Sequence, residues 1–148
     1  MINTCSITFI CEKVNFFLKD KKRIQNWIRT TIQTEKQAGG TLCFVFCTDG
    51  HLLEMNKKFL KHDYYTDILS FDYSTPSEKN KNVRIISGDL LISLDRVMEN
   101  AKELGHNFDE ELRRVMIHGI LHLLGYSDKT VSEKAKMRKK ENACLANY

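Results

Sequence analysis

The spacing of apolar residues predicts a strand followed by a helix at the start of the chain. Residues 7–11 alternate between apolar and polar side chains, which is typical of a strand. Apolar residues then recur every three or four positions over residues 24–32, as on one face of a helix. The Gly39-Gly40 pair is expected to stop this helix.

A second strand and helix are predicted directly after the glycines. Residues 42–47 are apolar at every position, which indicates a central strand that is covered on both faces. Thr48 or Asp49 can cap a following helix, in which Leu52 and Met55 share one face.

The middle of the chain predicts two further strands around a polar segment. Residues 68–73 form the first, and residues 83–92 form a longer one in which Gly88 suggests a bulge or the close approach of another group. Residues 74–82 between them are polar, contain the only proline, and are expected to be the most mobile loop.

Three helices are predicted after this strand, each from a local signal. Ser93 is placed to cap the first, which should end at Gly105. Acidic residues 109–111 suit the start of the second, which should end before Gly125. Thr130 and Glu133 have the spacing of a capping box at the start of a basic last helix. We therefore expect an α/β (α+β) fold with a mixed sheet of about four strands, surrounded by helices, in one domain over residues 1–148.

Composition narrows the class of protein. The chain has 148 residues, is 42% hydrophobic, and has a net charge of +4, which suits one domain with an apolar core and permits, without requiring, a polyanionic partner. Apolar runs fall short of the ~20 residues that cross a bilayer, and no secretory leader is visible. A membrane partner is therefore not expected, and the chain is expected to be cytoplasmic. The five cysteines should be reduced thiols rather than disulfides.

Two histidines four residues apart form the most informative motif. His118 and His122 lie on one face of the second of these helices, so both imidazoles can reach one ion. Gly125 can turn the chain after the helix and bring Asp128 round as a third ligand. Two nitrogens and one carboxylate oxygen leave a fourth position for water, the arrangement of a catalytic zinc site.

Two other interpretations of this motif remain open. Both histidines could be ordinary hydrogen-bonded core residues, although their apolar neighbours make a bound metal the better partner. The ligand spacing is also that of the extended zinc-protease motif, but Gly119 stands where those proteases place a general-base glutamate. A zinc-dependent amide hydrolase is therefore less favoured.

The same stretch resembles the bacterial YbeY family of metal-dependent endoribonucleases, or rRNA maturation factors. Upstream, Asn56, Phe59, Asp63, residues 66–71 and residues 88–92 also resemble family segments, and Glu133, Met137 and Glu141 match a downstream spacing. The signature of the family is matched at His118, Gly119, Leu121, His122, Leu123, Gly125 and Tyr126.

This resemblance implies an α/β fold with a zincin-like metal-binding helix and cleavage of single-stranded RNA. It further implies maturation of the 16S ribosomal RNA 3′ end and quality control of the small ribosomal subunit. Three positions depart from the family pattern: Ser127-Asp128 replaces Asp-His, Leu60 replaces a basic residue, and Tyr65 replaces proline. We therefore expect one divalent ion, zinc, held by His118, His122 and Asp128.

Basic residues near the family segments are candidates for phosphate contacts. Lys57, Lys61, Arg113 and Arg114 are the preferred ones. The proton-transfer residue is not identified from the sequence, although His62, Asp67 and Ser70 are polar candidates. The first hypothesis is thus a metal-dependent endoribonuclease, and the alternative is a ribosome-assembly factor that binds RNA or protein and whose metal is structural.

Overall fold

Four strands of a computed structural model, which describes residues 5–62 and 65–148, form a mixed sheet in the order β1-β2-β5-β3. β1, β2 and β5 run parallel, and β3 is antiparallel to β5. A two-residue strand, β4, also pairs with β5. The predicted α+β class with a mixed sheet of about four strands is confirmed. The strands are β1 (Ser6–Cys11), β2 (Ala38–Cys47), β3 (Ile68–Asp72), β4 (Thr75–Pro76) and β5 (Arg84–Ser93).

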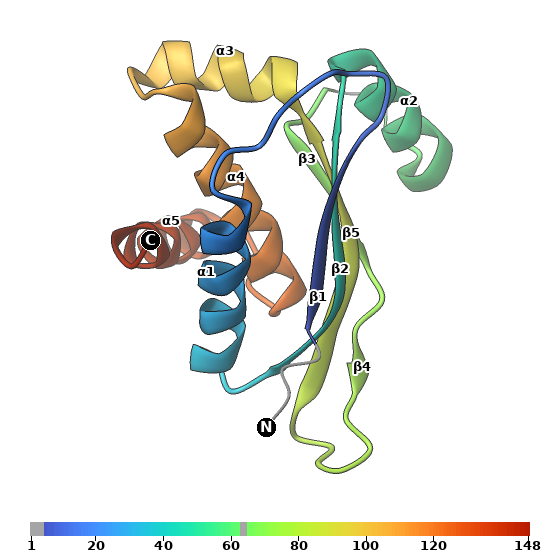
Figure 1. Ribbon diagram of the computed structural model, residues 1–148, viewed down its shortest axis with the longest axis vertical. Coiled ribbons are helices and arrows are strands. Elements are labelled where there is room, and N and C mark those ends of the chain that lie inside the picture. The colour runs from blue at the N-terminus through green and yellow to red at the C-terminus, as the bar shows by residue number, and fades with distance from the viewer. Residues whose placement is uncertain (1–4, 63–64) are drawn as a thin grey trace.

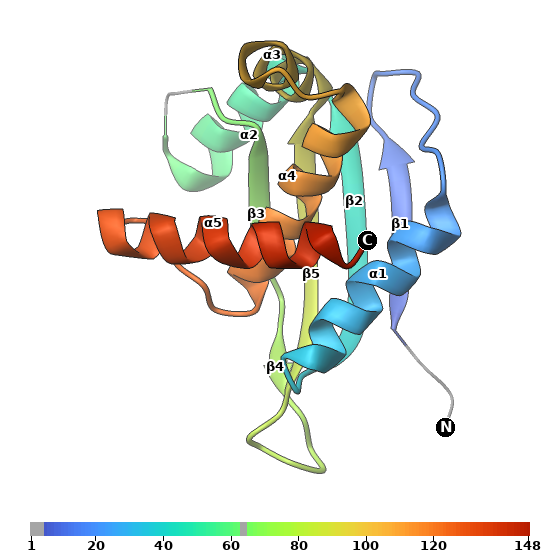
Figure 2. The ribbon, with the colours of Figure 1, turned by 90° about the vertical axis from the view of Figure 1, so that its left-hand side faces the viewer.

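Helices lie on both faces of the sheet (Figure 1). Figure 2 shows α1, α4 and α5 in front of one face, with α5 crossing α4, whereas α2 packs on the other side near β3 and α3 lies at the top. No helix in the described part of the chain is long and apolar enough to cross a membrane. The helices are α1 (Lys21–Thr34), α2 (Asp49–Leu60), α3 (Leu94–Leu104), α4 (Phe108–Leu123) and α5 (Val131–Ala146).

Three helices begin at side-chain caps that the sequence predicts. The Thr48 hydroxyl accepts a hydrogen bond from the His51 amide at 3.1 Å, and the Ser93 hydroxyl accepts one from Arg96 at 3.2 Å. Thr130 and Glu133 form a complete capping box, in which each side chain accepts from the backbone amide of the other residue. These bonds satisfy amides that have no partner inside the helix, which explains why each helix begins there.

Two sequence predictions about local structure are wrong. The first helix ends at Thr34, and Gly39-Gly40 lie inside β2 rather than stopping the helix. A Cβ atom at Gly39 would lie 2.4 Å from the Cys5 sulfur, so the glycine is needed for close contact between neighbouring segments. The predicted loop 74–82 contains β4, because its first residues continue the antiparallel pairing with β5.

Contact between α4 and the sheet positions the site. The buried face of α4 includes Met116 and Ile120, which pack in the same apolar core as Phe44 and Leu90 of the central strands. A Cβ atom at Gly88 would lie 2.5 Å from the Phe71 carbonyl oxygen and 3.2 Å from Leu123, so the predicted close approach at this glycine is confirmed. The C-terminal end of α4 is thereby held against β3 and β5.

Candidate metal centre

His118 and His122 project from the same side of α4, one turn apart. Their imidazoles meet edge to face with ring centroids 4.5 Å apart, and both side chains are partly buried. The helix places them there because residues four apart lie on one face, while the residues between them pack into the core. The two imidazoles therefore point away from the apolar core, where a third side chain can reach them.

A tight turn after α4 brings that third group. Gly125 has φ +103°, and its amide donates to the His122 carbonyl oxygen at 3.0 Å, while the Tyr126 amide donates to Leu121 at 3.0 Å. This pair of bonds is a Schellman motif, which favours glycine because of the positive φ. The Tyr126 hydroxyl donates to Glu35 at the end of α1, which anchors the turn. Asp128 follows two residues later and points back at the histidines.

The three side chains converge at distances that suit one ion. The Asp128 Oδ2 atom lies 3.3 Å from Nε2 of His118 and 3.3 Å from Nε2 of His122. Ligand atoms about 2.0–2.1 Å from a tetrahedral zinc are separated by roughly 3.3 Å, so both of these distances fit. The two Nε2 atoms are 2.9 Å apart and would separate slightly around an ion. The residues thus fit a divalent metal, which would polarise a phosphoryl oxygen and make bound water more acidic.

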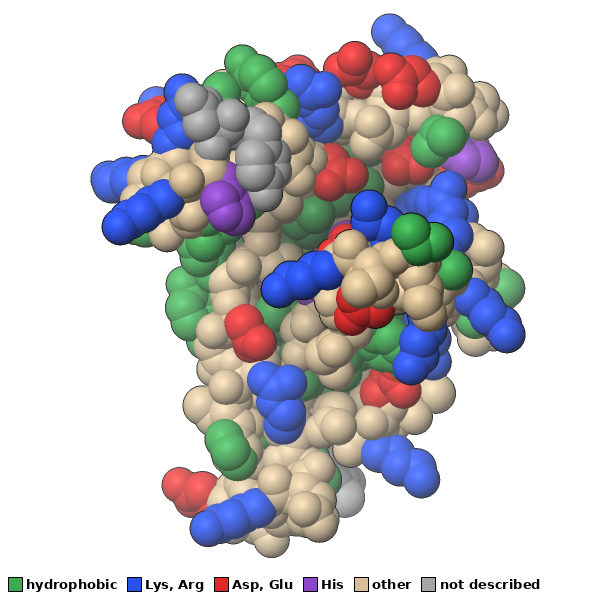
Figure 3. All heavy atoms as spheres, turned by 180° about the vertical axis from the view of Figure 1, so that it is seen from behind, with side chains coloured by type: hydrophobic (Ala, Val, Ile, Leu, Met, Phe, Trp, Pro, Cys, Tyr) green, Lys and Arg blue, Asp and Glu red, His purple; other side chains and the backbone are tan. Residues whose placement is uncertain are grey.

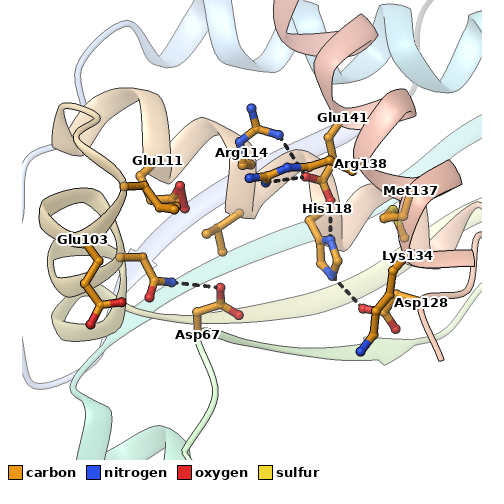
Figure 4. Close-up of a pocket in the computed structure, with 13 residues that line it drawn as sticks. Asp67, Glu103, Glu111, Arg114, His118, Asp128, Lys134, Met137, Arg138 and Glu141 are labelled. Atoms are coloured by element: carbon orange, nitrogen blue, oxygen red, sulfur yellow. Dashed lines mark hydrogen bonds and ion pairs between the residues drawn. The ribbon is translucent and has the colours of Figure 1, made fainter. Parts of the chain in front are cut away.

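Glu141 of α5 orients the first histidine. Its Oε2 atom lies 2.6 Å from Nδ1 of His118, and its Oε1 atom lies 3.1 Å from Nη1 of Arg114 (Figure 4). When Nδ1 carries the proton and donates it to Glu141, the Nε2 lone pair of His118 points toward Asp128 and His122. From the sequence, Glu141 matches only a family spacing and has no assigned role. Its distance of 23 residues from His118 explains why local patterns could not assign one.

Burial and neighbouring charges have opposite effects on the pKa values of His118 and Glu141. Burial acts to lower the pKa of His118, but the hydrogen bond and charge of Glu141, helped by Asp67 and Asp128, raise it above its usual value. Burial acts to raise the pKa of Glu141, but the bonds from His118 and Arg114 lower it. Protons therefore compete with a metal ion for His118, and metal binding should weaken as pH falls.

Gly119 packs against the sheet between the two histidines. A Cβ atom there would lie 2.7 Å from Cδ1 of Ile68 and 2.9 Å from Cδ2 of Leu90. A glutamate at this position, as zinc proteases have, would therefore force the side chains of Ile68 on β3 and Leu90 on β5 to move. The packing of α4 on the sheet thus favours glycine where a zinc protease has its general base.

Two cavities share His118 and Asp128 in their walls, and His122 lines the second of them. The first, about 440 Å³, lies between α3, α4 and α5 and has Arg114, Lys134 and Arg138 in its wall. The second, about 520 Å³, runs along β3 to the end of α2, and its wall includes Leu60 and His62. Figure 3 shows a hollow between α2, at the upper left, and the start of α5, with lysine and arginine side chains on both sides. The two cavities together have room for an extended polyanion that passes over the site.

The residues predicted to bind RNA lie in different places. Lys57 and Lys61 are exposed at the end of α2, next to the second cavity. Arg114 lines the first cavity, but its guanidinium is engaged by Glu141 and by Asn142. Arg113 lies over the Tyr148 ring, 4.4 Å from its centroid, and lines neither cavity. Asp63, which the family resemblance also matches, lies outside the described residues.

None of the five cysteines, which all lie within the described residues, forms a disulfide, as the sequence predicts. Cys5, Cys47 and Cys144 are buried, whereas Cys11 is exposed. Burial, together with the nearby carboxylates of Asp95, Glu12 and Asp49, raises the pKa of Cys47 to about 12. That thiol is therefore protonated at neutral pH, and it packs with Leu52, Leu69 and Leu91 in a small apolar cluster beside α2.

The fold and the site place the chain in the class of α+β domains with a helix-borne cluster that can hold one metal ion. A family model described as endoribonuclease YbeY matches residues 8–148. The chain therefore belongs to the YbeY endoribonuclease family, whose members are nucleases that hydrolyse phosphodiester bonds.

Individual relatives agree with this membership. The endoribonucleases YbeY of Cytophaga hutchinsonii and Parabacteroides distasonis are 44% and 43% identical over 141 residues, which cover 95% of this chain and 94% of each relative. The solution structure of TM1509 from Thermotoga maritima is similar with a TM-score of 0.59 and 26% identity, and the match covers 94% of this chain and 88% of that one. The resemblance stated from the sequence is confirmed.

Proposed function

We propose that this protein is a metal-dependent endoribonuclease that cleaves single-stranded precursors of ribosomal RNA, with the 3′ end of 16S RNA as its target and the small ribosomal subunit as its partner. Such a substrate would be met in the cytoplasm. The observation that carries the proposal is the convergence of Nε2 of His118, Nε2 of His122 and Oδ2 of Asp128 where two cavities meet, in a chain of an endoribonuclease family.

The proposed resident ion is one zinc. Two imidazole nitrogens and one carboxylate oxygen form a common donor set for catalytic zinc, and the spacing of the three atoms suits a tetrahedral site. Zinc is also the ion for which a three-residue site leaves one position open to water or a phosphoryl oxygen. Elemental analysis of protein purified without added chelator should find about one zinc for each chain.

Lysines at the end of α2 are the proposed phosphate contacts, together with the basic wall of the first cavity. Lys57 and Lys61 belong to the segment that also supplies Leu60 and His62 to the second cavity. Arg114 is proposed to act mainly through Glu141, and Arg113 to contact RNA outside the cavities. Binding by lysine and arginine should fall steeply with salt, because phosphate contacts release counterions.

Cleavage assays separate this proposal from the alternatives. The protein should cut a single-stranded 16S 3′-end precursor but neither the matching duplex nor a peptide library, and chelation should abolish cleavage until zinc is restored. Replacing both His118 and His122 by alanine should remove metal and cleavage. His106→Ala, a change of a histidine between α3 and α4 that lies in neither cavity, is the matched control.

Two results would contradict the proposal. RNA binding with no cleavage at any metal loading would indicate an assembly factor with a structural metal. Cleavage of peptides with no effect on RNA would indicate an amide hydrolase. Lys57→Ala with Lys61→Ala should weaken binding at low salt, whereas Lys79→Ala with Lys81→Ala, on the hairpin before β5, should not.

A further inference from the structure

Asp67 occupies a fixed place at the junction of three elements. It immediately precedes β3, and its carbonyl oxygen accepts a hydrogen bond from the Ser93 amide at 2.9 Å, which ties it to the end of β5. Its Oδ2 atom accepts a hydrogen bond from Nδ2 of Asn100 on α3 at 3.4 Å. Backbone and side chain are thus both held, so the carboxyl group has a defined orientation.

The carboxyl group of Asp67 faces the place where the two cavities meet. Asp67 lines both cavities, as do His118 and Asp128, so it borders the space next to the metal cluster from either side. Figure 4 shows its carboxyl group pointing into the pocket that His118 also lines. A phosphate bound at the cluster, with RNA entering both cavities, would have Asp67 beside it.

Apart from the candidate ligand Asp128, the other acidic side chains around the two cavities are either engaged elsewhere or line only the first cavity. Glu141 is held by His118 and Arg114, and Asp72 forms an ion pair with Arg84 at 3.5 Å. Glu103 and Glu111 line only the first cavity. Within residues 5–62 and 65–148, Asp67 forms no ion pair, and the Asn100 amide is its side-chain partner. Asp67 is therefore the carboxyl group that is available at the junction.

The surroundings of Asp67 shift its pKa upward. Burial raises the pKa of Asp67, and the charge of Glu141 also raises it, whereas His118 and the amides of Asp67 and Ile68 act to lower it. The groups that face the same space from neighbouring elements are Glu103 on α3, Glu111 and Arg114 on α4, and Lys134 and Arg138 on α5. An acid whose pKa lies closer to neutrality transfers a proton more effectively at physiological pH.

We propose that Asp67 is the general acid of RNA cleavage and donates a proton to the leaving oxygen of the scissile phosphodiester. This inference rests on the proposed endoribonuclease function. Water adds to phosphorus, the bond between phosphorus and the leaving ribose oxygen breaks, and the proton of the Asp67 carboxyl group goes to that oxygen. The products are a phosphate monoester and an alcohol. The Asp67 carboxylate then regains a proton from solvent, to which the attacking water has lost one.

A sulfur substitution in the RNA tests this role directly. Asp67→Asn keeps the shape and can still bond to Asn100, but it cannot donate an acidic proton. On ordinary single-stranded RNA, the cleavage rate at saturating substrate should fall about 10²–10⁴-fold. In an RNA with sulfur at the leaving position, the departing thiolate needs no proton. On that RNA, the Asp67→Asn protein should cleave within about tenfold of the unmodified protein.

The pH dependence gives a second readout. The rate of the unmodified protein should decline as pH rises through the pKa of Asp67, because only the protonated acid can donate. This decline should disappear in Asp67→Asn, and Asp67→Glu should restore part of it. Glu111→Gln changes a buried acid that lines only the first cavity, and any loss that it causes should be equal for the oxygen and sulfur substrates.

Each outcome supports or overturns the assignment. Zinc content and thermal unfolding are measured for every variant, so that loss of the ion or of the fold is not mistaken for loss of the acid. If Asp67→Asn slows both substrates equally with metal and fold intact, Asp67 is not the general acid. Unchanged cleavage of ordinary RNA by this variant would also overturn the proposal. If the unmodified protein cleaves neither substrate, the proposed function fails and this inference fails with it.

Discussion

The imidazole of His118 and the carboxylate of Glu141, which lie 23 residues apart on α4 and α5, meet at 2.6 Å between Nδ1 and Oε2. The contact joins the helix that bears the two histidines of the candidate metal site to α5. Because Arg114 holds the other oxygen of Glu141 at 3.1 Å, the carboxylate is fixed from two sides. This pair sets the direction of the Nε2 lone pair of His118 and hence the geometry of the site.

Glu141→Gln should weaken metal binding about 10–100-fold, because the amide is a poorer partner for the Nδ1 proton than the carboxylate. Metal affinity is measured by isothermal titration of zinc into the chelator-treated protein. Glu99→Gln, which changes an exposed carboxylate on α3, serves as the control for net charge. Equal zinc affinity in the Glu141→Gln protein and the unmodified protein would show that this contact does not orient the ligand.

Asp128→Asn should lower zinc affinity at least tenfold, since a neutral amide is a much poorer ligand than a carboxylate. The stability of the metal-free protein should change little, because asparagine can serve in the turn as well as aspartate does. Asp128→His should keep the ion, because imidazole can occupy the same corner of the site. Zinc titration and metal-free thermal unfolding check both statements. Unchanged zinc affinity in Asp128→Asn would mean that Asp128 only stabilises the turn and does not bind the ion.

Gly119→Ala should destabilise the protein by about 1–3 kcal/mol, because the new methyl group would overlap Ile68 and Leu90 in a packed core. Urea denaturation of the metal-free protein measures the free energy of unfolding. Gly50→Ala is the matched control, since no atom beyond its chain neighbours and its own helix backbone lies within 4 Å of its Cβ position in α2. It should be neutral or stabilising by up to about 1 kcal/mol through helix propensity. Equal effects of the two changes would contradict the packing argument.

The free energy of unfolding of Glu111→Gln should increase relative to that of the unmodified protein as pH rises. Glu111 is buried, one of its carboxylate oxygens has no partner in the described residues, and burial raises its pKa above the usual value of 4.5 although Arg114 acts to lower it. The folded state therefore holds this proton at pH values where the unfolded chain has lost it. The contribution of Glu111 to stability consequently declines as pH rises from about 4.5 to the folded pKa.

The check on Glu111 is a series of urea unfolding curves between about pH 4 and pH 8 for both proteins. The free energy of unfolding of Glu111→Gln minus that of the unmodified protein should increase with pH in this window and level off above the folded pKa of Glu111. Glu103→Gln, a change of an exposed acid on α3, is the control for the removal of one carboxylate. A difference that stays constant with pH would mean that Glu111 titrates alike in both states.

Local signals in the sequence determined most of the helices and strands and much of the candidate metal site. The caps at Thr48, Ser93 and Thr130 were predictable because each bond spans three residues, and the His118–His122 pair because helical spacing fixes it. The turn at Gly125 was predictable for the same reason, since a positive φ favours glycine.

Tertiary structure alone decided the contacts between distant segments. The sequence could not assign Glu141 to His118 or Asn100 to Asp67, because such pairs depend on how α5 and α3 pack around α4 and the sheet. It also assigned Gly39-Gly40 to the end of a helix, whereas their proximity to Cys5 and Ser87 places them in β2. Contacts within one helical turn are set by backbone geometry. Contacts between distant segments form only when the helices and strands pack against one another.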